Sequence, residues 1–142
     1  HMYRARANRA RFVNAVLTHA DLREMDSYDA RFTDADLTGA TLTGANLEQA
    51  DMTRSKLLRT DLTRARLLRA SLEYADFTGA SMVKTQLEGA NLVDADLSKT
   101  DLTGANLSGA DVSGARFADA LLGNVSWTDR RRCRPESVGK CE

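Results

Sequence analysis

The sequence predicts a repeat fold whose backbone returns to the same position every five residues. Three regularities predict it: a large apolar residue at every fifth position, a small residue two places before it, and frequent glycine two places after it. A five-residue step would carry side chains roughly 140° around a helix, and it would place them alternately on the two faces of a strand. Neither element gives these side chains a shared core, so the repeat must belong to the backbone itself.

The large apolar series begins at Phe12 and ends at Trp127. Of its 24 positions, 23 are apolar, and the exception is Ser27. Alanine stands two places earlier at 18 of the 24 sites, from Ala10 to Ala120. We therefore expect two residues of every five to point inward, one large and one small, and the other three to face water.

Glycine marks the expected corners of the repeat. Seven of the nine glycines fall two places after the large residue: Gly39, Gly44, Gly79, Gly89, Gly104, Gly109 and Gly114. A turn that requires a positive φ favours glycine, because glycine has no Cβ to clash in that conformation. The composition agrees with a fold of small repeated parts, since only 6% of the residues are aromatic.

The motif Ala-(Asp/Asn)-Leu-x-x recurs along the chain. Clear copies, some with Phe or Val in place of Leu, are Ala35-Asp36-Leu37, Ala45-Asn46-Leu47, Ala75-Asp76-Phe77, Ala90-Asn91-Leu92, Ala95-Asp96-Leu97, Ala105-Asn106-Leu107 and Ala110-Asp111-Val112. In this motif the chain resembles the pentapeptide-repeat proteins over about residues 10 to 127. The resemblance implies an all-β fold, a right-handed, quadrilateral parallel β-helix in which 20 residues make one coil and about six coils stack.

The chain divides into a repeat region, residues 10–127, and two ends. Each end of a β-helix would expose unpaired backbone and apolar core unless something covers it. We expect Trp127, the largest residue of the series, and the tail 128–142 to cap the C-terminal end of the core. Residues 1–9 are assigned to an N-terminal cap, with the segment from Tyr3 to Arg11 covering the other end; His1-Met2 looks like a cloning remnant.

The regular pattern is broken at Met25 and Ser27. Here the large and small inward residues are exchanged, yet the register resumes at Phe32 without insertion or deletion. One interpretation is a volume-conserving swap, in which Met25 fills the space that Ser27 leaves. The other is a local bulge or recognition spot next to Tyr28.

One coil, residues 51–70, is strongly basic. Its only acids are Asp51 and Asp61. Against them stands a basic belt of six residues: Arg54, Lys56, Arg59, Arg64, Arg66 and Arg69.

The belt has two interpretations. Stacking at an offset of 20 residues places Arg54 beside Asp34, and Lys56 between Asp36 and Asp76, which favours ordinary surface ion pairs of little energy. No acid stands at that offset for the other four: Arg59, Arg64, Arg66 and Arg69. If the surface binds an anionic partner, these four residues are the candidates.

Both cysteines, Cys133 and Cys141, lie in the tail. Two cysteines do not make a zinc site, and their spacing is not that of a redox Cys-x-x-Cys pair, so a small disulfide loop is expected. The tail is also similar to that of some exported bacterial pentapeptide-repeat proteins. A disulfide favours the periplasm or the exterior of the cell, and a cytoplasmic protein is the alternative.

Catalysis finds little support in the sequence. His19, the one histidine besides His1, has no nucleophile spaced to pair with it. Evenly spaced acids on a smooth rod lack the pocket that would shift a pKa, and no cofactor or metal site is expected. The prediction is a non-enzymatic scaffold that binds a protein partner through a rigid face, with no membrane span.

The resemblance also implies an alternative function. Some members of the family mimic duplex DNA, bind DNA gyrase or topoisomerase IV and protect it from inhibitors. This chain departs from that pattern, because its repeats carry no insertion, its rod is short and its basic belt interrupts an acidic surface. Direct binding of nucleic acid is not expected, and a homodimer could form through Leu58 and Leu68 or the C-terminal end.

Overall fold

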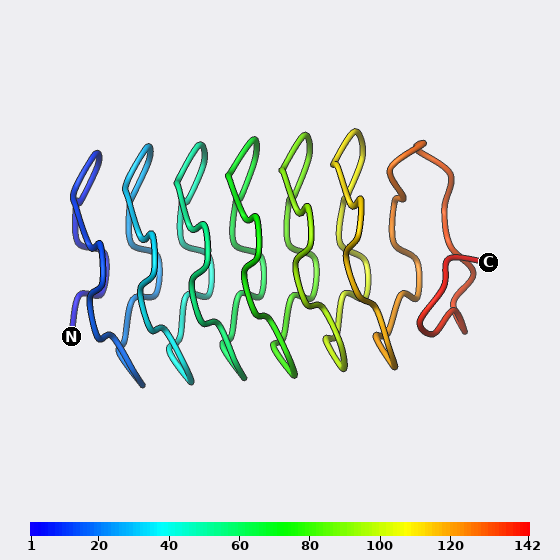
Figure 1. Ribbon diagram of the computed structural model, residues 1–142, viewed down its shortest axis with the longest axis horizontal. Coiled ribbons are helices and arrows are strands. Elements are labelled where there is room, and N and C mark those ends of the chain that lie inside the picture. The colour runs from blue at the N-terminus through cyan, green and yellow to red at the C-terminus, as the bar shows by residue number, and fades with distance from the viewer.

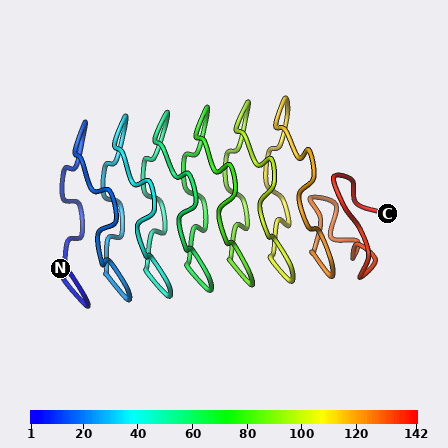
Figure 2. The same cartoon turned by 90° about the horizontal axis from the view of Figure 1, so that it is seen from below.

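The protein is a rod of stacked coils, described over all of residues 1–142 by a computed structural model (Figure 1). Parallel bridges join residues 20 apart, from Arg6 with Asp26 near one end to Asn106 with Ser126 near the other. Figure 2 shows the same stack from a perpendicular direction, with the two termini at opposite ends of the rod. The chain forms no helix, and therefore no helix that could cross a membrane.

Each coil has four sides, and every side contributes a single bridging residue rather than a longer strand. The bridges form four ladders along the rod, and two of them, which lie opposite each other, matter below. The Arg66 side runs through Arg6, Asp26, Asn46, Arg66, Gln86, Asn106 and Ser126. The Lys56 side runs through Val16, Asp36, Lys56, Asp76, Asp96 and Arg116. Backbone bonds hold the coils together: the N–H of Leu37 donates to the carbonyl of Lys56 at 2.7 Å.

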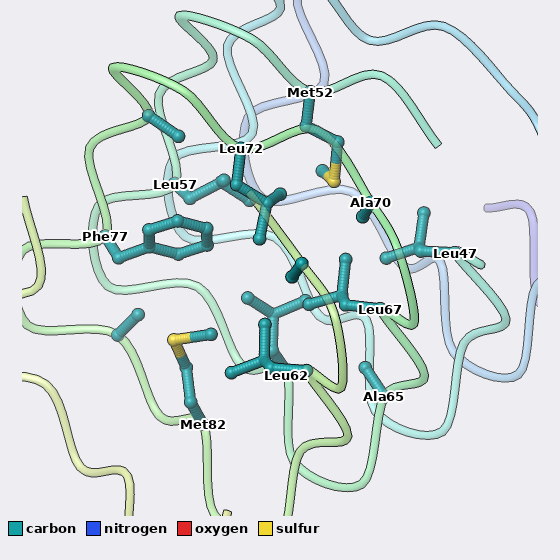
Figure 3. Packing of buried hydrophobic residues seen from close by; sticks show 14 of the residues in the cluster. Leu47, Met52, Leu57, Leu62, Ala65, Leu67, Ala70, Leu72, Phe77 and Met82 are labelled. Carbon is teal, nitrogen blue, oxygen red and sulfur yellow. The ribbon is translucent and has the colours of Figure 1, made fainter. Parts of the chain in front are cut away.

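The inside of the rod is filled by the large and small residues of the repeat. From Leu22 to Leu107 the large residues are fully buried, and Figure 3 shows labelled leucines, methionines and Phe77 pointing into the interior. Where a serine or threonine replaces the small alanine, its hydroxyl finds a backbone acceptor; Thr60 Oγ1 donates to the carbonyl of Leu37 at 3.0 Å. At these small positions the backbone can therefore pass close to the core while the buried hydroxyls stay paired.

A two-residue turn forms each corner, and its second residue has a positive φ. The predicted corner glycines are there, with φ values such as +68° at Gly39. The Asp or Asn of the motif supports the same turn, because its side-chain oxygen accepts the backbone N–H two residues later, as Asp36 does from Thr38 at 3.0 Å. This bond explains why the motif prefers Asp and Asn immediately before the large residue.

Residues 1–9 form part of the first coil and do not fold over its end. The N–H of Met2 already donates to the carbonyl of Asp21, and Ala7 donates to Asp26 at 2.7 Å. The five-residue turn pattern simply extends back to the start of the chain. As a result Phe12, which stacks on Phe32 with ring centroids 4.7 Å apart, remains partly exposed at this end.

The tail 128–142 turns back and pairs with the last coil. Two antiparallel bridges, Leu121 with Val138 and Ser126 with Arg132, replace the parallel ladder. The sulfurs of Cys133 and Cys141 are bonded at 2.01 Å, and both residues are buried. The tail thereby covers Leu122 and Val125, which are fully buried.

Trp127 lies at the edge of this cap. Its ring packs against Phe117, with centroids 5.3 Å apart and planes tilted by 57°. Trp127 is only partly buried, as are Val112 and Phe117 on the part of the end that the tail does not pair with. The C-terminal end of the core is thus closed mainly over the segment that runs from Ala120 to Val125.

Met25 and Ser27 keep the register of the repeat. Both are buried, Met25 at the alanine position and Ser27 at the leucine position, and no bulge interrupts the bridges on either side. This arrangement favours the volume-conserving swap. The hydroxyl oxygen of Ser27, however, has no hydrogen-bond partner, unlike the hydroxyls at the small positions.

Candidate functional site

The six residues of the basic belt surround the rod and do not share one face. Four arginines occupy four successive corners: Arg54, Arg59, Arg64 and Arg69. The other two belt residues, Lys56 and Arg66, lie on opposite sides of the coil. A single flat partner can therefore contact only part of the belt. The Lys56 side is flanked by Arg54 and Arg59, and the Arg66 side by Arg64 and Arg69.

Part of the belt is neutralised by acids of the neighbouring coil. Arg54 Nε lies 2.8 Å from Asp34 Oδ1, the pairing that the offset of 20 residues predicts. Lys56 stands between Asp36 and Asp76 in the ladder, and its charge helps to lower the pKa of Asp36, although the bonds from Thr38 are the larger cause.

Arg66 has no acid at an offset of 20 residues, as the sequence indicates, but it has an acidic partner at another offset. Its guanidinium forms an ion pair with Glu48. The acid stands 18 residues away rather than 20, because the long arginine side chain crosses to the turn that follows the ladder position in the preceding coil. Side chains therefore also couple diagonally, as Asn106 does with Glu88.

Arg59, Arg64 and Arg69 take part in none of the ion pairs that the structure contains. All three are exposed and have φ values between +52° and +58°, the left-handed region in which glycine is favoured. Glycine stands next in the stack for two of them: the side chains of Arg59 and Arg69 pass over Gly79 and Gly89, with each Cγ 3.5 Å from where a Cβ would be. These cations are thus exposed and unshielded.

Sequence reasoning left Lys84 out of the belt. Lys84 follows Arg64 in the same corner, one coil further along the rod, so that two like charges are adjacent. Gly44 precedes this pair and Gly104 follows it, and Cγ of Lys84 lies 3.4 Å from the position of a Cβ on Gly104. The spacing of 20 residues between Arg64 and Lys84 could have predicted from the sequence that the two cations are adjacent.

A groove of about 440 Å³ opens beside Arg69. Its lining residues are Glu48, Gln49, Leu68, Arg69, Glu88 and Gly89. Leu68 is half-buried, as is Leu58, so part of each side chain remains on the surface. The groove exists because Gly89 has no side chain where the adjacent coil carries Arg69.

A family model describes the same repeat. The model of pentapeptide repeats, in eight copies, matches residues 30–68, 59–85, 70–109 and 80–119. Together these segments cover more than half of the chain. The chain is a pentapeptide repeat protein. No curated protein matches it in sequence.

Solved structures of pentapeptide repeat proteins share this fold. Rfr23 from the cyanobacterium Cyanothece 51142 is 32% identical, with a TM-score of 0.62 over 63% of this chain and 61% of that one. HetL from the cyanobacterium Nostoc is 27% identical, with a TM-score of 0.53 over 89% and 76% of the two chains. A protein from the Arabidopsis thaliana thylakoid lumen is 28% identical, with a TM-score of 0.56 over 77% and 85%.

Several aspartates of this pentapeptide repeat protein have a lowered pKa, which favours their charged form. Hydrogen bonds from Thr38 lower the pKa of Asp36, and those from Ser113 lower the pKa of Asp111. The Arg23 guanidinium lowers the pKa of Asp21 to about 2. A general acid at neutral pH needs the opposite shift, so these groups serve the turns and ion pairs of the rod rather than proton transfer.

His19, the one candidate base considered in the sequence, lies at an exposed corner. Its ring covers Gly39, where a Cβ would lie 2.5 Å from Nδ1. The glycine therefore makes room for the imidazole of the preceding coil. This contact gives His19 a packing role on the surface.

Proposed function

We propose that this protein is a non-enzymatic module that binds another protein through the outer surface of a rigid rod. In this proposal the rod is the right-handed, quadrilateral β-helix of its family, with about six coils. Adjacent coils are joined by backbone bonds on all four sides, so the surface side chains keep a fixed spacing of about 4.8 Å along each ladder. Such a surface is suited to recognition by position and charge.

The observation that carries the proposal is the set of arginines at the four corners of the belt. Arginine at a positive φ is strained relative to glycine, and other coils carry glycine at several of these corners. Three of the four arginines have no acidic partner that would compensate. Residues that strain the backbone without stabilising the fold are candidates for function.

The disulfide and one relative support a location outside the reducing cytoplasm. Cys133 and Cys141 are both paired, which leaves no free thiol. Disulfides persist in oxidising compartments. The Arabidopsis relative comes from the thylakoid lumen. We therefore propose an exported protein, in the periplasm or outside the cell. HetL is described as involved in the regulation of heterocyst differentiation, a regulatory role that agrees with binding rather than catalysis.

Affinity capture tests the proposal. The immobilised protein, with its disulfide intact, is incubated with extracts of the source organism, and retained proteins are identified by mass spectrometry. We compare it with a belt variant in which the six belt residues are changed to glutamine. The matched control changes six basic residues elsewhere to glutamine: Arg4, Arg6, Arg9, Arg11, Arg31 and Arg116.

We expect the wild type and the control to retain a shared partner that the belt variant loses. Retention of the same proteins by all three would contradict a role for the belt, and specific retention of none would contradict the binding module. A supercoiling assay with DNA gyrase, with and without a quinolone, forms a separate arm. Inhibition of the gyrase, or protection from the quinolone, would replace this proposal by the DNA-mimic alternative.

A further inference from the structure

We propose that the Arg66 side is the docking surface, and that its partner is an acidic, extended protein segment. Carboxylates of that segment would pair with Arg64, Lys84 and Arg69, and an apolar side chain would lie on Leu68 in the groove. This inference rests on the proposed function and adds to it the face of the rod and the chemistry of the partner.

The charge of this side is the first argument. Over four consecutive coils the ladder residues Asn46, Arg66, Gln86 and Asn106 include no acid, and Asp26 lies in the coil before them. The opposite ladder carries Asp36, Asp76 and Asp96, followed by Arg116. At the positive-φ position, the two flanking corners carry cations and no acid over the same coils, although Glu48 and Glu88 stand at the first turn position of one of them. One corner runs Gly44, Arg64, Lys84, Gly104, and the other runs Gln49, Arg69, Gly89, Gly109. The side therefore presents three unpaired cations, from both of its edges.

The acids at the edge of this side each have one partner on the rod, although Glu88 Oε2 is buried without one. Glu48 pairs with Arg66, and Glu88 Oε1 accepts from Asn106 Nδ2 at 2.6 Å. Neither acid reaches Arg69, which has no partner in the structure. A carboxylate brought by another chain would therefore meet a guanidinium free to form the short, charge-assisted bonds that arginine makes with carboxylates.

The groove is the second argument, because it gives the surface a place for an apolar side chain. Leu68 is the one hydrophobic residue of its lining, between Glu48 in the preceding coil and Glu88 in the next. Apolar surface beside an unpaired cation suits a segment that carries an apolar residue and acidic residues on the same face. In an extended chain, however, neighbours point to opposite sides, so the leucine and the acids that contact the rod are two residues apart.

Protein is favoured over nucleic acid by what surrounds Arg69. A continuous phosphate backbone would run past Glu48 and Glu88, whose charges repel it, whereas a peptide can place single carboxylates between them. Nucleic-acid surfaces also use exposed aromatics on which bases stack. The exposed Tyr74 lies at another corner, and the exposed Tyr3 belongs to the first coil.

Fluorescence anisotropy with a defined probe tests the inference. The probe is a fluorescein-labelled nine-residue peptide with the sequence Gly-Glu-Thr-Leu-Thr-Glu-Thr-Glu-Gly, in which the leucine and the acids lie on one face of the extended chain, titrated with the full chain at low salt. The test variant changes Arg64→Gln, Arg69→Gln and Lys84→Gln. The matched control removes three charges from the opposite side, with Arg54→Gln, Lys56→Gln and Arg59→Gln.

We expect the test variant to raise the Kd of the peptide about tenfold or more, and the control to change it less than about twofold. Leu68→Ser should weaken binding about threefold or more, while Leu58→Ser, at the equivalent turn position of another corner, should have no effect. Arg64→Gly, Arg69→Gly and Lys84→Gly together form a second test variant. These glycines relieve the backbone strain, so loss of binding by this variant is not a folding defect.

Three results would overturn the inference. The first is no binding of the peptide by the wild type. The second is an equal loss in the two glutamine variants, which would mean that only net charge matters. The third is tighter binding of a labelled twelve-nucleotide single strand through the same three cations. If the peptide does not bind but affinity capture still yields a belt-dependent protein, this inference fails and the proposed function stands.

Discussion

Arginine at a corner of the rod competes with the backbone conformation that the corner requires. Arg64 has a φ of +58°, and the two nearest glycines of its corner, Gly44 and Gly104, have φ values of +67° and +70°. A residue with a Cβ pays about 1 kcal/mol or more in this region, and glycine avoids that cost at the expense of a more flexible unfolded chain. The belt is therefore a place where stability and surface chemistry oppose each other.

We predict that Arg64→Gly stabilises the protein by about 0.5 kcal/mol, the difference between the relieved strain and the added unfolded-state entropy. The free energy of unfolding in urea, followed by circular dichroism, measures the change. The reverse substitution, Gly104→Arg, is the control and should destabilise the rod. A loss of stability in Arg64→Gly would show that the guanidinium makes a stabilising contact.

Ser27 is a second residue at odds with its surroundings. Its hydroxyl is buried and has no partner, whereas the hydroxyl of Ser55 donates to the carbonyl of Met52 at 2.7 Å. We predict that Ser27→Ala is neutral or stabilises the protein by up to about 1 kcal/mol, and that Ser55→Ala costs about 1 kcal/mol. Thermal unfolding of the two variants measures both. Destabilisation by Ser27→Ala would mean that its hydroxyl is satisfied in solution.

The C-terminal tail depends on one glycine that is not at the positive-φ position of its corner. Gly123 lies directly after Leu122 rather than two places after it, and its φ is not positive. A Cβ there would lie 2.5 Å from the carbonyl oxygen of Pro135. Because that oxygen belongs to the backbone, the tail can pass over the last coil only while residue 123 lacks a side chain.

We predict that Gly123→Ala displaces the tail and destabilises the cap by about 1–3 kcal/mol. Faster hydrogen exchange at the amides of Leu122 and Cys133, which donate to Ser137 and Val125, would report the displacement. Gly109→Ala is the control, since no atom lies within 4 Å of the added Cβ. Gly109→Ala should lower stability only through backbone strain, so the tail amides should stay protected from hydrogen exchange. Unchanged exchange in Gly123→Ala would contradict the prediction.

The disulfide closes the tail over the end of the core. Cys133 and Cys141 are 8 residues apart, and Cys133 N–H donates to Val125 in the last coil. We predict that Cys133→Ser with Cys141→Ser lowers the free energy of unfolding by about 2–3 kcal/mol, the loop-closure value for a loop of this size. Denaturation with and without reductant measures it. The double variant should be insensitive to reductant, and an equally stable variant would mean that the hydrogen bonds alone hold the tail.

The rod as a whole should be sensitive to acid because its aspartates are stabilised as anions. The pKa values of Asp34, Asp36 and Asp111 lie below the ordinary value of 3.8, and that of Asp21 is about 2. A depressed pKa in the folded state contributes stability above the unfolded value. That contribution is lost as the pH falls through 3.8 toward the folded value.

We therefore predict a melting temperature that changes little between pH 7 and pH 5 and falls steeply between pH 4 and about pH 2. Asp36→Asn with Asp111→Asn should lose less on acidification, because asparagine still accepts the turn N–H, as Asn46 does from Glu48 at 3.2 Å. Melting curves at a series of pH values compare the two proteins. An identical acid transition in the variant would place the titrating groups elsewhere.

Most of the core could be predicted from the sequence, because each inward position is set by its place within a five-residue repeat. The residues from Leu37 to Leu107 that were expected to point inward are buried, and Gly39 and its counterparts have the positive φ expected of corners. The ion pair between Arg54 and Asp34 could also be predicted, since coils in register place residues 20 apart side by side. The pairing of Arg66 with Glu48 could not, because the reach of a side chain across a turn does not follow the backbone period.

The period of five, the identity of the inward residues and the excess of cations in residues 51–70 all follow from the order of the amino acids, because each depends on neighbours in the chain or on one constant offset. The side-chain contacts of the belt residues do not follow from the order of the amino acids. Whether Arg66 reaches Glu48 across a turn, and whether Gly89 leaves a groove beside Leu68, depends on how the coils pack in space. The same holds for the tail, whose path over Gly123 is set by packing against the last coil.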